Sequence, residues 1–135
     1  MKIRKIYIDD CPFNPCGQGG IQFEDDSLIV DLHDQDCCEH VYADFSNLDT
    51  DIMNYDFKSV SIRDAKEGFM FGDGRRWFFV PCYNEQNGYY NDALDIAYGH
   101  YALKLTGYNK KGPTYKYQFV PKFTLEGCQV EDQYY

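Results

Sequence analysis

Apolar and polar side chains alternate with a period of two along much of this chain, and the 3.6-residue period of an amphipathic helix is not developed. Successive side chains of a strand point to opposite faces, so the alternation predicts strands with one buried face. The predicted strands are 28–33, 41–45, 58–64, 76–83, 95–106 and 115–119. The run 76–83 contains Trp77-Phe78-Phe79-Val80 and is predicted to be a central strand buried on both faces.

Residues that favour turns separate the predicted strands. Glycine, asparagine and proline gather at 16–20, 72–74, 87–88 and 107–113, and only 46–54 has a brief helical pattern. Closely spaced strands with at most one or two short helices predict a mainly β protein, whose antiparallel sheet is curled into a barrel or sandwich. The 135 residues are predicted to form a single β-rich domain, 1–135.

Composition narrows the classes of partner. The chain has 13 tyrosines and 10 phenylalanines, which suit half-buried pleated surfaces, and its formal net charge is −9. Binding to nucleic acid needs clustered lysine and arginine, so we expect no direct nucleic-acid binding. The acidic surface favours solubility; one alternative is that it imitates DNA and inhibits a nucleic-acid-binding protein.

The sequence also bears on the cellular compartment. The first residues contain no apolar segment of signal-peptide length, and no stretch approaches the roughly 20 apolar residues of a membrane helix. We therefore expect a cytoplasmic protein with no membrane partner. In that compartment the cysteines, at 11, 16, 37, 38, 82 and 128, are expected to be thiols rather than disulfides.

Side chains that can bind a metal or transfer a proton are concentrated in residues 33–40, His-Asp-Gln-Asp-Cys-Cys-Glu-His. If 28–33 and 38–45 form a hairpin with a short loop between them, Val30 lies opposite Val41 and the apolar side chains share one face. The opposite face then forms a candidate functional face of Asp31, His33, Cys38, His40 and Tyr42.

That face allows several interpretations. Side chains directly opposite each other on paired strands lie about 4.5–5.5 Å apart at Cβ, so His33 could contact Cys38 and Asp31 could contact His40. These four side chains could bind a divalent metal such as zinc. Alternatively, a neighbouring His33 could make Cys38 nucleophilic, or the face could bind a partner without chemistry. Opposed polar pairs are also ordinary on the wet face of a hairpin.

A second candidate follows the predicted strand 76–83, where the chain enters a loop rich in amides and phenols. Tyrosine and asparagine suit recognition because they combine rigid area with adaptable hydrogen bonds. Cys82 is predicted to be a small buried residue rather than a nucleophile. Neither segment predicts catalytic residues or a cofactor. The candidate recognition loop comprises Asn84, Gln86, Asn87, Tyr89 and Tyr90.

Two short motifs carry a resemblance. Gln35-Asp36-Cys37-Cys38-Glu39 with Val41-Tyr42, and later Gln86-Asn87-Gly88-Tyr89-Tyr90, resemble a family of small bacterial and phage-borne domains with no assigned activity. The resemblance implies a cytosolic domain of bacterial or mobile-element origin, whose two motif segments lie close together. It implies no catalytic or ligand-binding role for any residue.

Together these features predict a non-catalytic interaction or structural domain with a protein partner. Two alternatives stay open: a metal-binding protein that uses the face of the 28–45 hairpin, and an acidic inhibitor of a nucleic-acid-binding protein.

Overall fold

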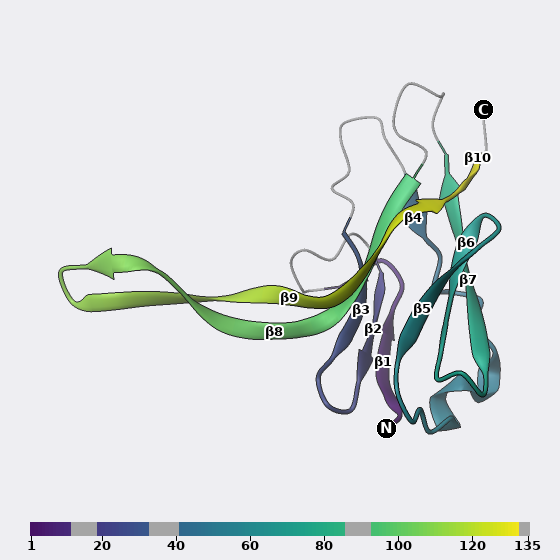
Figure 1. The fold of residues 1–135 in the computed structure, drawn as a ribbon, viewed down its shortest axis with the longest axis horizontal. Helices are drawn as coiled ribbons and strands as arrows, with labels where there is room; N and C mark the ends of the chain where they lie inside the picture. Colours follow the sequence, from purple (N-terminus) through teal and green to yellow (C-terminus); the bar gives the residue numbers. More distant parts are fainter. Residues whose placement is uncertain (12–18, 33–40, 86–92, 133–135) are drawn as a thin grey trace.

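The computed structural model describes residues 1–11, 19–32, 41–85 and 93–132, and the account of the structure is confined to them. They form two β-sheets packed face to face as a sandwich, with a long two-stranded arm that extends from one side (Figure 1). The prediction of a mainly β, antiparallel fold is confirmed. Among the described strands, the two sheets form a sandwich and do not close into a barrel.

The first sheet has the strand order β1-β2-β3-β8-β9 and is antiparallel throughout. Because β1 and the β8–β9 pair lie at opposite edges, the arm leaves the sandwich on the side away from β1 (Figure 1). The strands are β1 (Ile3–Tyr7), β2 (Gly20–Phe23), β3 (Leu28–Asp31), β8 (Ala93–Asn109) and β9 (Gly112–Gln129).

The second sheet has the order β10-β7-β6-β5, and the short β4 also pairs with β7. Its pairs are antiparallel except for the short parallel contact of β10 with β7. Its strands are β4 (Val41–Ala43), β5 (Ser61–Ala65), β6 (Gly68–Gly72), β7 (Trp77–Asn84) and β10 (Glu131–Asp132). The short helix expected within 46–54 is a 3-10 turn, η1 (Thr50–Asn54).

Strand β7 is central in its sheet, but the prediction that both of its faces are buried is wrong. Its residues alternate between buried and more accessible positions, and the Phe79 side chain is 43% exposed. The inward face packs on the first sheet, whereas the outward face is accessible to solvent. The apolar run Trp77-Phe78-Phe79-Val80 is therefore part of a strand with one buried face and one accessible face.

Aromatic rings fill the space between the sheets. Phe57 precedes β5 and lies at the centre, with ring centroids 4.8 Å from Tyr55, 5.5 Å from Phe23 and 5.7 Å from Phe78. Phe71 also stacks on Phe57. Since aromatic side chains bury large apolar areas and their contacts add to that burial, this cluster joins the two sheets.

The Asp73 carboxylate holds the turn between β6 and β7 against the segment before β5. Its side chain is fully buried and accepts hydrogen bonds from the Tyr55 hydroxyl, the Lys58 backbone N–H and the Arg75 guanidinium. Burial alone would raise the pKa of Asp73, but these hydrogen bonds lower it well below its usual range.

Replacing Asp73 with asparagine should destabilise the protein in a pH-dependent way. An amide cannot accept all of these hydrogen bonds, so we expect D73N to cost about 1–3 kcal/mol at pH 7. The folded pKa lies below the unfolded value of about 3.9, so this stabilisation is present above that pH and is lost as the pH falls below it.

The measurement is urea unfolding of both proteins at neutral and at acidic pH. The difference between wild type and D73N should shrink in acid. The exposed carboxylate of Asp64 supplies the matched control, D64N, which should change stability little at either pH. An equal loss for D73N at both pH values would contradict the proposed role of the charge.

Candidate functional site

The hairpin predicted from residues 28–45 does not form. β3 pairs with β2 and β8 in the first sheet, where Val30 lies opposite Ala97. β4 pairs with β7 in the second sheet, where Val41 lies opposite Asn84. The two predicted strands are present, but the prediction that they pair with each other is wrong, because β3 pairs with β2 and β8 and β4 pairs with β7.

This arrangement places the two described residues of the candidate functional face in different sheets. Asp31 lies in β3 and is only 1% exposed, whereas Tyr42 lies in β4 of the other sheet. The remaining members, His33, Cys38 and His40, lie outside the described residues, so the metal and thiol interpretations stay predictions. Within the part of the chain that the structure describes, no three or more His, Cys, Asp and Glu side chains are grouped so as to hold a metal ion.

The described residues that flank the two motif segments lie at neighbouring positions of the sandwich. Asn84, near the end of β7, pairs with Val41, where β4 begins. In the first sheet, the Leu32 backbone N–H donates to the carbonyl of Asp95, 2.9 Å away. The residues before 33–40 and after 86–92 are therefore close to each other in the first sheet. The residues after 33–40 and before 86–92 are close to each other in the second sheet. Both places are at one end of the sandwich (Figure 1).

Four polar side chains lie at this end of the sandwich, two of them buried and two half-buried. Asp31 and Asn84 are buried, and the hydroxyl of Tyr42 donates to Oε1 of Glu85, 2.9 Å away. Burial and the neighbouring Glu85 carboxylate raise the pKa of Tyr42. Of the candidate recognition loop, only Asn84 is described; Gln86, Asn87, Tyr89 and Tyr90 lie outside the described residues.

Two cysteines lie beside this polar cluster. The sulfur atoms of Cys82 and Cys128 are 3.9 Å apart, and Cys128 donates to the carbonyl of Gly68. Hydrogen bonding with Cys128 and burial raise the pKa of Cys82, and the Asp31 charge acts in the same direction. A thiol with a raised pKa is a poor nucleophile, so the expectation of a buried, unreactive Cys82 agrees with its surroundings.

The expectation that the cysteines are thiols holds for two of the three described ones. Cys82 and Cys128 are free and buried, whereas Cys11 is disulfide-bonded, which corrects the prediction at that position.

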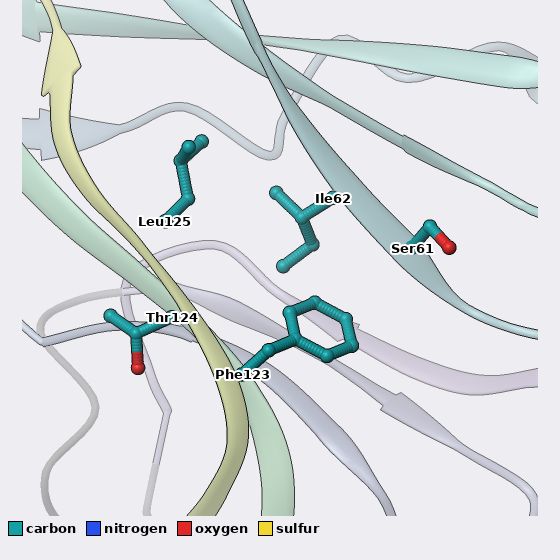
Figure 2. Close-up of a pocket in the computed structure, with 5 residues that line it drawn as sticks. All are labelled: Ser61, Ile62, Phe123, Thr124 and Leu125. Atoms are coloured by element: carbon teal, nitrogen blue, oxygen red, sulfur yellow. The ribbon is translucent and has the colours of Figure 1, made fainter.

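An apolar pocket lies between β5 and β9, which are edge strands of the two sheets. It has a volume of about 340 Å³, and the side chains of Ile62, Phe123 and Leu125 approach one another across it (Figure 2). Ser61 and Thr124 complete the lining. Because no charged or titratable group lines it, this pocket suits an apolar side chain rather than acid–base chemistry.

Among the described residues, the most exposed large apolar side chains lie on the arm, residues 100–120. The last pair between β3 and β8 is Leu28 with Gly99, and beyond it β8 pairs with β9 alone among the described strands. One face of the arm carries the cross-strand pairs Leu103–Tyr117 and Leu105–Tyr115. These four side chains are exposed by 55%, 71%, 49% and 53%, in that order.

The apolar face of the arm continues the hydrophobic surface of the sandwich. The pair Tyr101–Phe119 lies at the base of the arm on the same face, and it packs against Leu28 and Val30 on the outer side of β3. β3 is therefore buried on both sides, and its outer surface leads without interruption onto the exposed pairs of the arm.

The opposite face of the arm is polar and basic. Lys104 lies directly opposite Lys116, and the Thr106 and Thr114 hydroxyls are 3.2 Å apart. The arm contains four of the chain's 13 basic residues and none of its 22 acidic residues. The rest of the chain therefore has nine basic against 22 acidic residues, so charge is strongly segregated between the two parts.

The sequence contains a pattern that predicts the two strands of this surface but not their exposure. Alternation in 101–105 and 115–119 predicted two one-sided strands, and glycine at 107 and 112 marked a turn between them. Pairing the two strands across that turn would have placed both apolar sets on one face. Their exposure was not predictable, because alternation ordinarily indicates burial.

Comparison with known proteins finds no family model, no curated sequence and no solved structure that matches this chain. The resemblance to small bacterial and phage-borne domains stays a prediction. No helix among the described residues has the length and apolar character needed to cross a membrane.

Proposed function

We propose that this protein is a non-catalytic interaction or structural domain that contacts a protein partner through the apolar face of its β8–β9 arm. The observation that carries the proposal is the exposure of the two cross-strand pairs Leu103–Tyr117 and Leu105–Tyr115 on one face. Large contiguous apolar patches on a soluble domain mark interaction sites. Aromatic side chains are also enriched at the centres of protein interfaces.

The construction of the arm supports the same conclusion. A two-stranded ribbon alone in water is marginally stable, so an arm of about 10 residues per strand gains stability when another surface covers it. At about 3.3 Å per residue, it reaches some 30 Å beyond the sandwich. A ribbon of that reach suits contact with a neighbouring molecule, and the sandwich serves as its rigid support.

The proposal is tested by site-specific photo-cross-linking in cells of the protein's source. A photoreactive phenylalanine analogue replaces Tyr117 on the apolar face, and in a matched control it replaces Lys104 on the polar face. We expect protein adducts of discrete mass from position 117, reduced by excess unlabelled wild type and weaker from position 104. Equal labelling from both faces, or no protein adduct from position 117, would overturn the proposed contact face.

A further inference from the structure

We infer that the partner of the arm is a second copy of this chain, which receives the arm in an acid-rimmed groove beside β1. This inference rests on the proposed function of the arm and names its partner. The groove has a volume of about 230 Å³ and lies between β1 and the segment around η1. Its apolar lining includes Ile6, Ile8, Leu48, Ile52 and Met53.

The distribution of exposed apolar side chains points to these two surfaces. Besides Phe79, the large apolar residues that are strongly exposed in the described chain lie either on the arm or, as Ile8 and Met53, in this groove. The groove is concave and the arm is a narrow projecting ribbon. Burying one in the other would remove both apolar surfaces from water, which is favourable in proportion to the area covered.

The charges of the two surfaces are opposite. Asp49 lines the groove, the exposed Asp9 and Asp10 directly follow Ile8, and Asp51 lies in η1. Arg76 contacts Asp49 and Asp51 and offsets part of this charge. On the arm, exposed lysines at 104, 110, 111 and 116 face no acidic residue of the arm itself.

The pairing of Lys104 with Lys116 adds an energetic reason for an acidic partner. Like charges directly opposite each other on neighbouring strands destabilise a ribbon. Carboxylates brought by a second molecule would offset that repulsion. Because the ribbon is one layer thick, the long lysine side chains can reach past its edge while the apolar face packs in the groove.

The topology places the arm and the groove so far apart that the arm of one molecule cannot dock in its own groove. β1 lies at one edge of the first sheet and the β8–β9 pair at the other, and the arm projects away from β1 (Figure 1). The contact is therefore head-to-tail, with each molecule using its arm on one neighbour and its groove on another. Such a heterologous contact produces a ring or an open filament rather than a closed two-fold dimer.

The test uses two variants that each remove one side of the contact. The arm variant, L103T with Y117T, keeps residues that favour strands and removes apolar area. The groove variant, I8K with M53K, places positive charge where the basic arm would dock. All four positions are exposed, so both variants should retain the wild-type unfolding midpoint.

Analytical ultracentrifugation measures the result across a wide range of concentration and at low and high salt. Wild type should show a mass that rises with concentration and falls with added salt. Each variant alone should stay monomeric. An equimolar mixture should form a heterodimer and stop there, because one variant supplies only an arm and the other only a groove.

Several outcomes would overturn the inference: a wild type that is monomeric throughout, an arm variant that associates like wild type, or a mixture that contains no heterodimer. Binding of a DNA duplex by a monomeric wild type, lost on K104E with K116E, would instead assign the arm to nucleic acid. If position 117 cross-links to a different protein while wild type stays monomeric, the proposed function stands and self-association falls.

Discussion

Replacing Phe57 with alanine should cost about 3–5 kcal/mol of folding free energy, a large share of the roughly 5–15 kcal/mol by which a typical domain is stable. The Phe57 side chain is 2% exposed and contacts rings from both sheets, among them Phe23 and Phe78. Its removal leaves a cavity between sheets that are held apart by the remaining large rings, so the site cannot collapse fully.

The measurement is the free energy of unfolding from urea titration, followed by tyrosine and tryptophan fluorescence. F79A provides the matched control, since the same substitution is made on the outward face of β7. It should cost less than about 1 kcal/mol. A loss for F57A no larger than that for F79A would show that Phe57 does not join the two sheets.

Gly99→Ala should cost about 3 kcal/mol, at the upper end of the range for overpacked sites. A Cβ at this position would lie 2.1 Å from the Val120 carbonyl oxygen and 2.8 Å from the Pro121 Cα. Both contacts are with backbone, so β8 and β9 would have to separate. The substitution falls where the pairing register of these strands shifts and where the arm leaves β3.

The G99A substitution should also weaken the pairing of β8 with β9 in the arm, and this effect can be measured separately from global stability. Hydrogen exchange of amides in 100–120 should become faster in G99A, in addition to the fall in the unfolding midpoint. The control is A102V, at a partly exposed position on the polar face of the arm. It adds more side-chain volume than G99A but lies beyond the base of the arm. If A102V destabilises the protein as much as G99A, the close backbone approach at Gly99 is not the cause.

Sequence alternation predicted strands well and their partners poorly. The runs at 28–33 and 41–45 contain real strands, but the expected single core face of Leu28, Val30 and Val41 is wrong. Leu28 and Val30 lie on the outer side of β3, and Ile29, from the opposite face, packs with Val41 in the core between the sheets. Because β3 is buried on both faces, its apolar pattern indicates neither which face points inward nor which strand is its partner. Val30 pairs with Ala97 and Val41 pairs with Asn84. Both partners are far away in the sequence, and no local pattern indicates such pairings.

The candidate site also shows that residues close in sequence need not belong to the same sheet. Residues 33–40 are a concentration of reactive side chains in the sequence, yet the described members of the proposed face, Asp31 and Tyr42, belong to different sheets. The arm was visible as two alternating runs around a turn. Its role depends on where the rest of the sandwich ends, and this follows only from the three-dimensional arrangement.

The pairing of β8 with β9 also has a consequence for how the chain folds. The arm closes around the tight turn between Asn109 and Gly112, whereas the sandwich depends on contacts such as that of Tyr98 with Ser27, 71 residues apart. Hairpins form within about 1–10 μs, and long-range pairing is slower. The marginally stable β8–β9 ribbon is therefore expected to form and expose its apolar face before the sandwich is complete. Refolding should then give the least aggregation at low protein concentration.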